Sequence, residues 1–166
     1  KKIKISFETK NTALLHGVTS SGKTEIYVQL IEEILKQKKQ VLYMLPEIAL
    51  TTQLISRLQY YFGEKISVYH SKYSISERVE VWNNVLENKP KAQVIIGARS
   101  SLFLPFFKLG LIIVDEEHEP SFKQYAPSPR YNGRDSAVVL AKLHNAKVLM
   151  GSATPSLESY YNAKND

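Results

Sequence analysis

Eight residues near the amino terminus constrain the fold most strongly, because they place two glycines, a lysine and a threonine at fixed spacing. The segment reads Gly17-Val18-Thr19-Ser20-Ser21-Gly22-Lys23-Thr24, between the apolar residues 13–15 and the helix-forming residues 25–30. Glycines permit backbone angles that are closed to other residues, so successive N–H groups can converge on an anion. The pattern predicts a strand, a loop that cradles phosphates, and a helix.

Two polar residues of this segment, Lys23 and Thr24, have a specific expected role. The helix that begins at Lys23 directs its positive end toward the phosphates. Lys23 is predicted to reach the β- and γ-phosphates of a nucleotide such as ATP, and the Thr24 hydroxyl to bind Mg²⁺. The alternative is a Gly/Ser-rich turn that holds a lysine by chance, which the strand–loop–helix context disfavours.

A second motif follows the apolar run Leu-Ile-Ile-Val at residues 111–114 and reads Asp115-Glu116-Glu117-His118. Such a run indicates a strand buried on both faces of a parallel sheet, and ligands of these sheets bind at the carboxyl ends of strands. Asp115 is predicted to hold Mg²⁺ beside Thr24, and Glu116 to orient and deprotonate the attacking water. A solvated acidic turn is the alternative. With Lys23, these two acids would be the catalytic residues of an ATP or GTP hydrolase.

Composition narrows the remaining classes. A chain of 166 residues suits one domain. The absence of cysteine excludes disulfides and cysteine-ligated zinc in this stretch. We expect a cytoplasmic protein, because there is no signal peptide and no apolar run that could cross a bilayer. The net charge of +6 modestly favours a polyanionic partner, although a lysine-rich surface without such a partner gives the same charge.

Short apolar runs alternate with amphipathic stretches along the chain. Strands are expected at residues 13–16, 41–44, 66–69, 94–97, 111–115 and 147–152. Helices are expected at residues 23–36, 48–62, 76–87, 134–144 and 155–163. This alternation predicts an α/β fold with a mostly parallel central sheet flanked by helices on both faces.

Local signals refine two of these helices. Ser74 and Glu77 have the spacing of a capping box, and Thr154 before Pro155 predicts the start of the last helix. Four apolar residues of the third helix share one face and predict packing against the core, namely Ile75, Val79, Trp82 and Leu86.

The long connection at residues 117–133 contains three prolines and alternates aromatic with basic side chains. Loops of this length inside a compact domain are usually functional or disordered. Aromatic faces and cations suit single-stranded nucleic acid, because bases stack and phosphates need countercharge. Aromatics that pin the loop to the domain would give the same composition, and the residues alone leave both possibilities open.

Taken in order, Gly17–Thr24, the acidic motif and Gly151-Ser152-Ala153-Thr154 resemble the first motor lobe of a superfamily 2 helicase. Longer phrases narrow the resemblance to the bacterial primosomal helicases that restart stalled replication forks. These phrases are Leu45-Pro46-Glu47-Ile48-Ala49-Leu50-Thr51, Gly97-Ala98-Arg99-Ser100-Ser101-Leu102-Phe103 and Gly151-Ser152-Ala153-Thr154-Pro155-Ser156.

The resemblance implies that residues 1–166 form one RecA-like ATP-binding lobe, excised from a longer chain, and that it uses ATP and Mg²⁺ without zinc. It implies that four residues couple nucleotide state to DNA binding: His118, Ser152, Ala153 and Thr154. It implies DNA contacts from Pro46, Glu47, Arg99 and Ser100, and from the loop residues Phe122, Lys123, Tyr125, Arg130 and Tyr131. The implied partners are single-stranded and forked DNA and, through the full-length chain, primosome proteins and single-stranded-DNA-binding protein.

Family members also have an amino-terminal DNA-binding region, a second motor lobe and cysteine-ligated zinc, which this stretch lacks. The second lobe normally supplies an arginine to the ATP site, so we expect the lobe alone to hydrolyse ATP negligibly. Unwinding in the 3′–5′ direction is implied by the resemblance alone. The alternatives are another superfamily 2 translocase, of a fork-remodelling or restriction type, and, further away, a small-molecule kinase or a docking surface.

Overall fold

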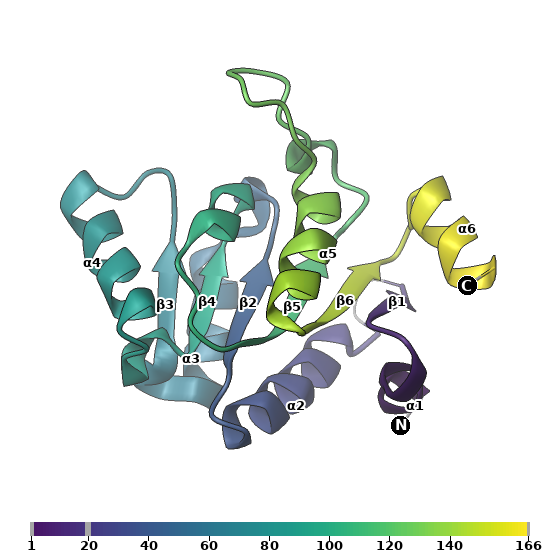
Figure 1. Ribbon diagram of the computed structural model, residues 1–166, viewed down its shortest axis with the longest axis horizontal. Helices are drawn as coiled ribbons and strands as arrows, with labels where there is room; N and C mark the ends of the chain where they lie inside the picture. The colour runs from purple at the N-terminus through teal and green to yellow at the C-terminus, as the bar shows by residue number, and fades with distance from the viewer. Residues whose placement is uncertain (1, 19–20, 166) are drawn as a thin grey trace.

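A computed structural model describes residues 2–18 and 21–165, so the predicted phosphate ligands Thr19 and Ser20 lie outside the described residues. Six parallel strands form one sheet in the order β1-β6-β5-β2-β4-β3 (Figure 1). The strands are β1 (Thr12–His16), β2 (Gln40–Met44), β3 (Ile66–Tyr69), β4 (Val94–Gly97), β5 (Leu109–Asp115) and β6 (Lys147–Ser152).

Helices connect the strands. The α-helices are α1 (Lys2–Thr9), α2 (Lys23–Lys36), α3 (Thr52–Phe62), α4 (Ile75–Leu86), α5 (Gly133–His144) and α6 (Leu157–Asn165). Short 3₁₀ turns are η1 (Glu47–Ala49), η2 (Gly63–Lys65), η3 (Pro90–Ala92), η4 (Arg99–Phe103) and η5 (Pro120–Phe122). Among the described residues, no helix is long and apolar enough to span a membrane.

The sheet separates two apolar cores, because successive side chains of a strand point to opposite faces. Leu42, Ile112 and Val148 pack with residues of α4 and α5 on one face. Their neighbours Val41 and Ile113 pack with residues of α1, α2 and α3 on the other. The predicted α/β fold with a parallel sheet covered on both faces is therefore confirmed.

Three helix starts differ from the expectation. The helix expected from residue 48 is interrupted, and α3 begins after Thr51, whose hydroxyl accepts a hydrogen bond from the Leu54 N–H. The last helix is capped by Ser156, whose Oγ accepts from the Ser159 N–H at 3.2 Å, and not by Thr154. Helix α1 was not expected at all, because its sequence carries no clear capping signal.

The prediction that an apolar stripe of α4 packs against the core is wrong. Ile75 and Leu86 are 76% and 54% exposed, and Val79 and Trp82 are exposed as well. The buried side of α4 is the adjacent stripe, where Val85 is fully buried and Val81 packs against the core. The capping box at the start of this helix is confirmed, since Ser74 and Glu77 make both reciprocal hydrogen bonds.

Strand order determines which motifs become neighbours. Because all strands are parallel, every motif that follows a strand lies at the rim of the sheet where the carboxyl ends of the strands meet. We call this rim the edge of the sheet. The phosphate loop, the Ser152-Ala153-Thr154 segment and the acidic motif follow the adjacent strands β1, β6 and β5. The phrases around Pro46 and Arg99 follow β2 and β4, next along the edge. The motifs predicted to bind nucleotide and those predicted to border DNA thus occupy two halves of one edge.

Candidate nucleotide-hydrolysis site

The three nucleotide motifs are held together by the sheet itself. His16 lies opposite Ser152 in the β1–β6 register, and Asp115 lies opposite Gly151 in the β5–β6 register. The Gly17 N–H then donates to the Ser152 carbonyl at 3.1 Å, so β1 remains attached to β6 as the phosphate loop begins. Segments separated by about a hundred residues are fixed side by side before any ligand binds.

Lys23 joins the phosphate loop to the acidic motif. It is the first residue of α2, and Gly22 before it has φ of 82°, the left-handed conformation that favours glycine. Its ammonium donates to the Gly17 carbonyl at 3.0 Å and lies 3.6 Å from Glu116 Oε1. Only 9% of Lys23 is exposed. The sequence prediction that these two turns meet is confirmed in this geometry.

Asp115 is held by two tyrosines that the sequence interpretation missed. The Tyr27 hydroxyl donates to Oδ1 and the Tyr43 hydroxyl to Oδ2, each at 2.9 Å. Burial raises the pKa of Asp115, although these two hydrogen bonds act in the opposite direction. Burial and the nearby carboxylate raise the pKa of both tyrosines, which stay protonated donors. The missed signal was Tyr27 at four residues after Lys23, which is the same face of α2.

Glu116 occupies an unusual backbone conformation. Its φ is 52°, in the left-handed region that few non-glycine residues adopt. Its carboxylate lies between the Lys23 ammonium and the His118 ring, whose Nδ1 is 3.7 Å from Oε2. With 34% of its side chain exposed, Glu116 is open to water while its charge is balanced. This is an arrangement in which a carboxylate can orient and deprotonate a water molecule.

The residues predicted to couple nucleotide and DNA lie within hydrogen-bonding distance of one another. The Ser152 hydroxyl is 2.7 Å from His118 Nδ1 and accepts from the Thr154 N–H at 3.0 Å. The Ala153 carbonyl lies 3.2 Å from Nε2 of His16, the residue before the phosphate loop. A movement of this segment would therefore reach both the acidic motif and the phosphate loop.

A buried ion pair beside these residues was also missed. The Glu117 side chain is fully buried and lies 3.2 Å from the Arg134 guanidinium. It also accepts from the Ser156 N–H at 2.8 Å and from the Ser159 hydroxyl at 2.8 Å. We call Glu117, Arg134, Ser156 and Ser159 the Glu117 clasp. It ties the acidic motif to the starts of α5 and α6, and only the long-range fold reveals it.

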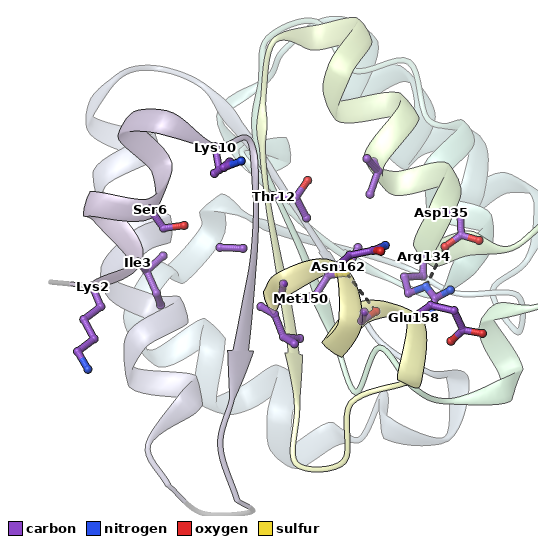
Figure 2. Close-up of a pocket in the computed structure, with 15 residues that line it drawn as sticks. Lys2, Ile3, Ser6, Lys10, Thr12, Arg134, Asp135, Met150, Glu158 and Asn162 are labelled. Carbon is purple, nitrogen blue, oxygen red and sulfur yellow. Dashed lines mark hydrogen bonds and ion pairs between the residues drawn. The ribbon is translucent and has the colours of Figure 1, made fainter. Parts of the chain in front are cut away.

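The clasp forms part of the wall of a pocket of about 640 Å³ beside the edge strand β1. Figure 2 shows Arg134 and Glu158 on one side of this pocket and α1 with Lys2, Ile3 and Ser6 on the other. None of the predicted nucleotide ligands that the structure describes lines it. This pocket therefore does not coincide with the predicted hydrolysis site.

Four predicted DNA-track residues lie at the carboxyl ends of β2 and β4. Pro46 is buried, while Glu47 and Ser100 are exposed. Arg99 is partly engaged by the loop after β5, because its guanidinium donates to the Ser121 carbonyl at 3.0 Å and stacks 5.7 Å from the Tyr131 ring centre. Arg99 thus connects the predicted DNA-track residues to the aromatic-rich loop.

The aromatic-rich loop, residues 117–133, combines an anchored base with an exposed tip. Its base closes as a narrow hairpin, with a bridge between Lys123 and Asn132, and its tip extends beyond the sheet edge (Figure 1). The tip residue Tyr125 is 64% exposed, with the Lys123 ammonium 5.1 Å from its ring centre. Arg130 is exposed as well.

Phe122 does not fit the prediction of a DNA contact. It is 2% exposed and packs in the core on the α5 face. Its ring is therefore closed to a stacking base, and Phe122 anchors the loop instead. Tyr131 is half-buried and packs edge-on against Phe103 with ring centres 5.3 Å apart. The anchoring alternative therefore applies to Phe122 and Tyr131, while a nucleic-acid contact by the exposed Tyr125 stays a prediction.

The donor set fits a magnesium nucleotide. Thr24 lies half-buried at the second position of α2, and Asp115 presents carboxylate oxygen at the end of β5. Within residues 2–18 and 21–165, no three His, Cys, Asp or Glu side chains gather as a metal site. Nucleotide-bound Mg²⁺ needs no such cluster, because phosphates and waters supply most of its ligands.

A parallel sheet with a Gly-Lys-Thr loop after β1 and an Asp-Glu pair after β5, two strands away, defines a P-loop nucleoside triphosphatase lobe. More specifically, the chain belongs to the DEAD/DEAH box helicase family, whose model matches residues 2–163.

The curated relatives are replication restart proteins. The chain is 52% identical to replication restart protein PriA of Haemophilus influenzae over 155 residues, covering 93% of this chain and 21% of that protein. It is 50% identical to PriA of Chlamydia pneumoniae over 153 residues, covering 92% and 20%. The corresponding match in Bacillus subtilis is 46% over 151 residues, covering 91% and 18%. The chain thus spans about a fifth of the length of these relatives.

Solved structures confirm the fold. RecG bound to a three-way DNA junction superposes with a TM-score of 0.64 at 23% identity, covering 92% of this chain and 19% of that chain. The helicase MrfA gives a TM-score of 0.63 at 17% identity, covering 98% and 28%. At these identities the similarity extends to the fold alone.

Proposed function

We propose that this chain is the ATP-binding lobe of a DNA-dependent ATPase that unwinds DNA 3′ to 5′, as a PriA-type helicase in replication restart. The observation that carries the proposal is the convergence of Lys23 on Glu116, at 3.6 Å, between two motifs far apart in sequence. The high identity to PriA proteins favours this type of helicase, while the direction of unwinding follows from the resemblance alone.

In this proposal, the residues of the site divide the work of hydrolysis. Bound Mg²⁺ would neutralise phosphate charge. Lys23 would exchange its contact with Glu116 for the phosphates, and Thr24 and Asp115 would hold the metal. Glu116, released from Lys23, would orient a water molecule and take its proton. The phosphate-loop residues Gly17, Val18, Thr19, Ser20, Ser21 and Gly22 would supply backbone donors.

DNA would follow the other half of the sheet edge. Glu47, Arg99 and Ser100 border it, and the tip of the aromatic-rich loop adds Tyr125 and its neighbouring cations. A base can stack on the exposed Tyr125 ring, while Lys123 and Arg130 neutralise phosphates. Contact at the tip would move the loop base, which is joined to Arg99 and to the clasp. His118, Ser152, Ala153 and Thr154 would carry this movement to the nucleotide.

In this proposal, efficient ATP hydrolysis requires parts of the full-length protein outside this chain. An arginine from a second lobe would complete the ATP site, so the lobe alone should bind nucleotide weakly and hydrolyse it negligibly. Single-stranded and forked DNA are the proposed substrates, and the proposed site of action is the cytoplasm. Primosome proteins and single-stranded-DNA-binding protein are partners proposed from the family resemblance.

The decisive experiment is Lys23→Ala in the full-length gene product. ATP-driven unwinding should fall by roughly two orders of magnitude or more, because the charge that meets the phosphates is lost. DNA binding without nucleotide should stay near the wild-type value. Lys36→Ala, at the exposed end of the same helix, is the matched control. Unwinding by Lys23→Ala at the wild-type rate would reject the proposal.

Another superfamily 2 translocase would share the whole lobe architecture, so the substrate distinguishes it. Comparing unwinding of forks with a leading-strand gap against translocation on intact duplex separates the two. A small-molecule kinase is tested by titrating single-stranded DNA at two salt concentrations. A helicase lobe should bind weakly and lose affinity as salt rises, whereas a kinase should not bind.

A further inference from the structure

Two buried tyrosines converge on one carboxylate from different elements. Tyr27 lies on α2, one turn after Lys23, and Tyr43 lies on β2, beside β5. Both side chains are 0% exposed, and their rings meet edge to face with centres 5.6 Å apart. Each hydroxyl donates to Asp115, one to each oxygen.

The fold dictates this convergence. Tyr43 pairs with Ile113 in the β2–β5 register, and Asp115 is two residues beyond Ile113 on the same face of the sheet. Helix α2 covers that face, and its Tyr27 side chain reaches Asp115 from the helix layer. Gly151 leaves the necessary room, because a methyl group there would collide with the Tyr27 hydroxyl. Tyr27 on α2, Tyr43 on β2 and the space at Gly151 together restrict the Asp115 carboxylate to one orientation.

Hydrogen-bond counting distinguishes the two carboxylate oxygens. Oδ1 accepts from the Tyr27 hydroxyl at 2.9 Å and from the Glu116 N–H at 3.2 Å. Oδ2 accepts only from the Tyr43 hydroxyl among the described residues. Since each oxygen offers two lone pairs, Oδ1 is fully used and Oδ2 keeps one. The free lone pair is the one available to a metal ion or to its water.

These hydroxyls are committed to the carboxylate. A buried phenol without a hydrogen-bond partner is destabilising, and phenylalanine would fill nearly the same volume without that requirement. Neither tyrosine hydroxyl makes another side-chain hydrogen bond among the described residues. Packing alone therefore does not explain why hydroxyls stand here.

We propose that Tyr27 and Tyr43 are positioning residues that fix Asp115 with Oδ2 turned toward the Mg²⁺ of bound ATP. The inference rests on the proposed function, since it assigns the metal-facing oxygen of that site. Partners that orient a metal-binding carboxylate typically change metal affinity by about 10–100-fold when removed. The tyrosines would act on the metal through Asp115 and touch neither metal nor nucleotide.

The test uses Tyr27→Phe, Tyr43→Phe and the double variant in the full-length gene product. ATP affinity is measured by calorimetry in excess EDTA and across a Mg²⁺ titration. Each single variant should raise the Mg²⁺ concentration needed for half-maximal tightening by about tenfold or more. ATP affinity in EDTA should stay within about twofold of wild type, because the phosphate loop is untouched. Tyr60→Phe, which removes a hydroxyl that is 86% exposed on α3, is the matched control.

The outcomes separate this inference from the proposed function. If the wild-type protein shows no Mg²⁺-dependent ATP binding, the proposed function itself fails. If the wild type binds and both tyrosine variants titrate with Mg²⁺ like Tyr60→Phe, only the positioning role is rejected. Equal loss of affinity with and without Mg²⁺ would also reject it, because that result indicates general disruption of the site. Thermal unfolding of each variant verifies that the fold persists.

Discussion

Removing Arg134 should destabilise the chain strongly, because it leaves the Glu117 carboxylate buried without its cation. The Glu117 side chain is 0% exposed and that of Arg134 is 13% exposed, so water screens the pair little. Losing one partner of a buried ion pair costs about 3–5 kcal/mol. Arg134→Ala therefore belongs among the most damaging single substitutions outside the apolar cores.

The structure places the cost near the lower end of that range. Glu117 would keep hydrogen bonds from the Ser156 N–H, the Ser156 hydroxyl and the Ser159 hydroxyl, at 2.8, 3.2 and 2.8 Å. These hydrogen bonds partly compensate the unpaired charge of Glu117. We therefore expect the free energy of unfolding to fall by about 3 kcal/mol. For a chain of this size, that loss lowers the unfolding midpoint by roughly 6–12 °C.

A second substitution makes the reasoning sharper. Glu117→Gln in the Arg134→Ala background removes the unpaired charge while retaining an oxygen that accepts from the serines. The double variant should be more stable than Arg134→Ala alone by about 1–2 kcal/mol, although Glu117→Gln alone should destabilise the wild type. The assay is urea unfolding of the wild-type chain and the three variants, followed by circular dichroism.

The matched control is the surface pair of Arg57 with Glu25, whose side chains are 48% and 50% exposed. Arg57→Ala should cost no more than about 1 kcal/mol, because exposed pairs are screened by water. The reasoning is refuted if Arg134→Ala costs no more than Arg57→Ala. It is also refuted if Glu117→Gln destabilises the Arg134→Ala background as much as the wild type.

Three further predictions concern α4 and the catalytic edge. Leu86→Ala should cost about 0.5 kcal/mol or less in urea unfolding, whereas Val85→Ala should cost about 1–3 kcal/mol, since only Val85 is buried. A hydrogen bond from Ser74 lowers the Glu77 pKa below its ordinary 4.5, so its contribution is present above that pH and disappears as pH falls through the lowered value. Glu77→Gln should thus lower the unfolding midpoint at pH 7, and the difference from wild type should shrink as the pH falls below 4.5 and through the lowered pKa of Glu77. Gly151→Ala should weaken Mg²⁺-dependent ATP binding, measured by calorimetry, because the added methyl displaces the buried Tyr27 hydroxyl.

The strands, and the meeting of Lys23 with Glu116, were predictable from local sequence, whereas the side chains that hold Asp115 and Glu117 were not. All six strands follow apolar runs that can be recognised locally, and the convergence of Lys23 with Glu116 follows once those strands are parallel. The tyrosines on Asp115 and the serines on Glu117 come from distant segments. Their hydroxyls carry no local signal, because their role depends on strand order and on the face each side chain takes.

The errors have equally physical origins. Helix α4 carries two adjacent apolar stripes, and periodicity alone cannot decide which one faces the sheet. The helix lies beside the edge strand β3, which is only half-buried, so the narrow contact leaves the stripe with Trp82 exposed. In the aromatic-rich loop, spacing likewise does not distinguish Phe122, which packs in the core, from Tyr125, which does not.

The sheet order places the acidic motif between the two groups of residues that are predicted to bind nucleotide and DNA. Strand β5 lies between β6 and β2. Strand β6 ends in the Ser152 segment, and β2 leads to the predicted DNA-track residues. The motif after β5 therefore touches both halves, and its four residues have different neighbours. Asp115 and Glu116 face the phosphate-loop helix, His118 contacts Ser152, and Glu117 holds the starts of α5 and α6. Because α5 also ends the aromatic-rich loop, a displacement of that loop would act on Glu117 through Arg134, two residues from Asp115, the proposed metal ligand.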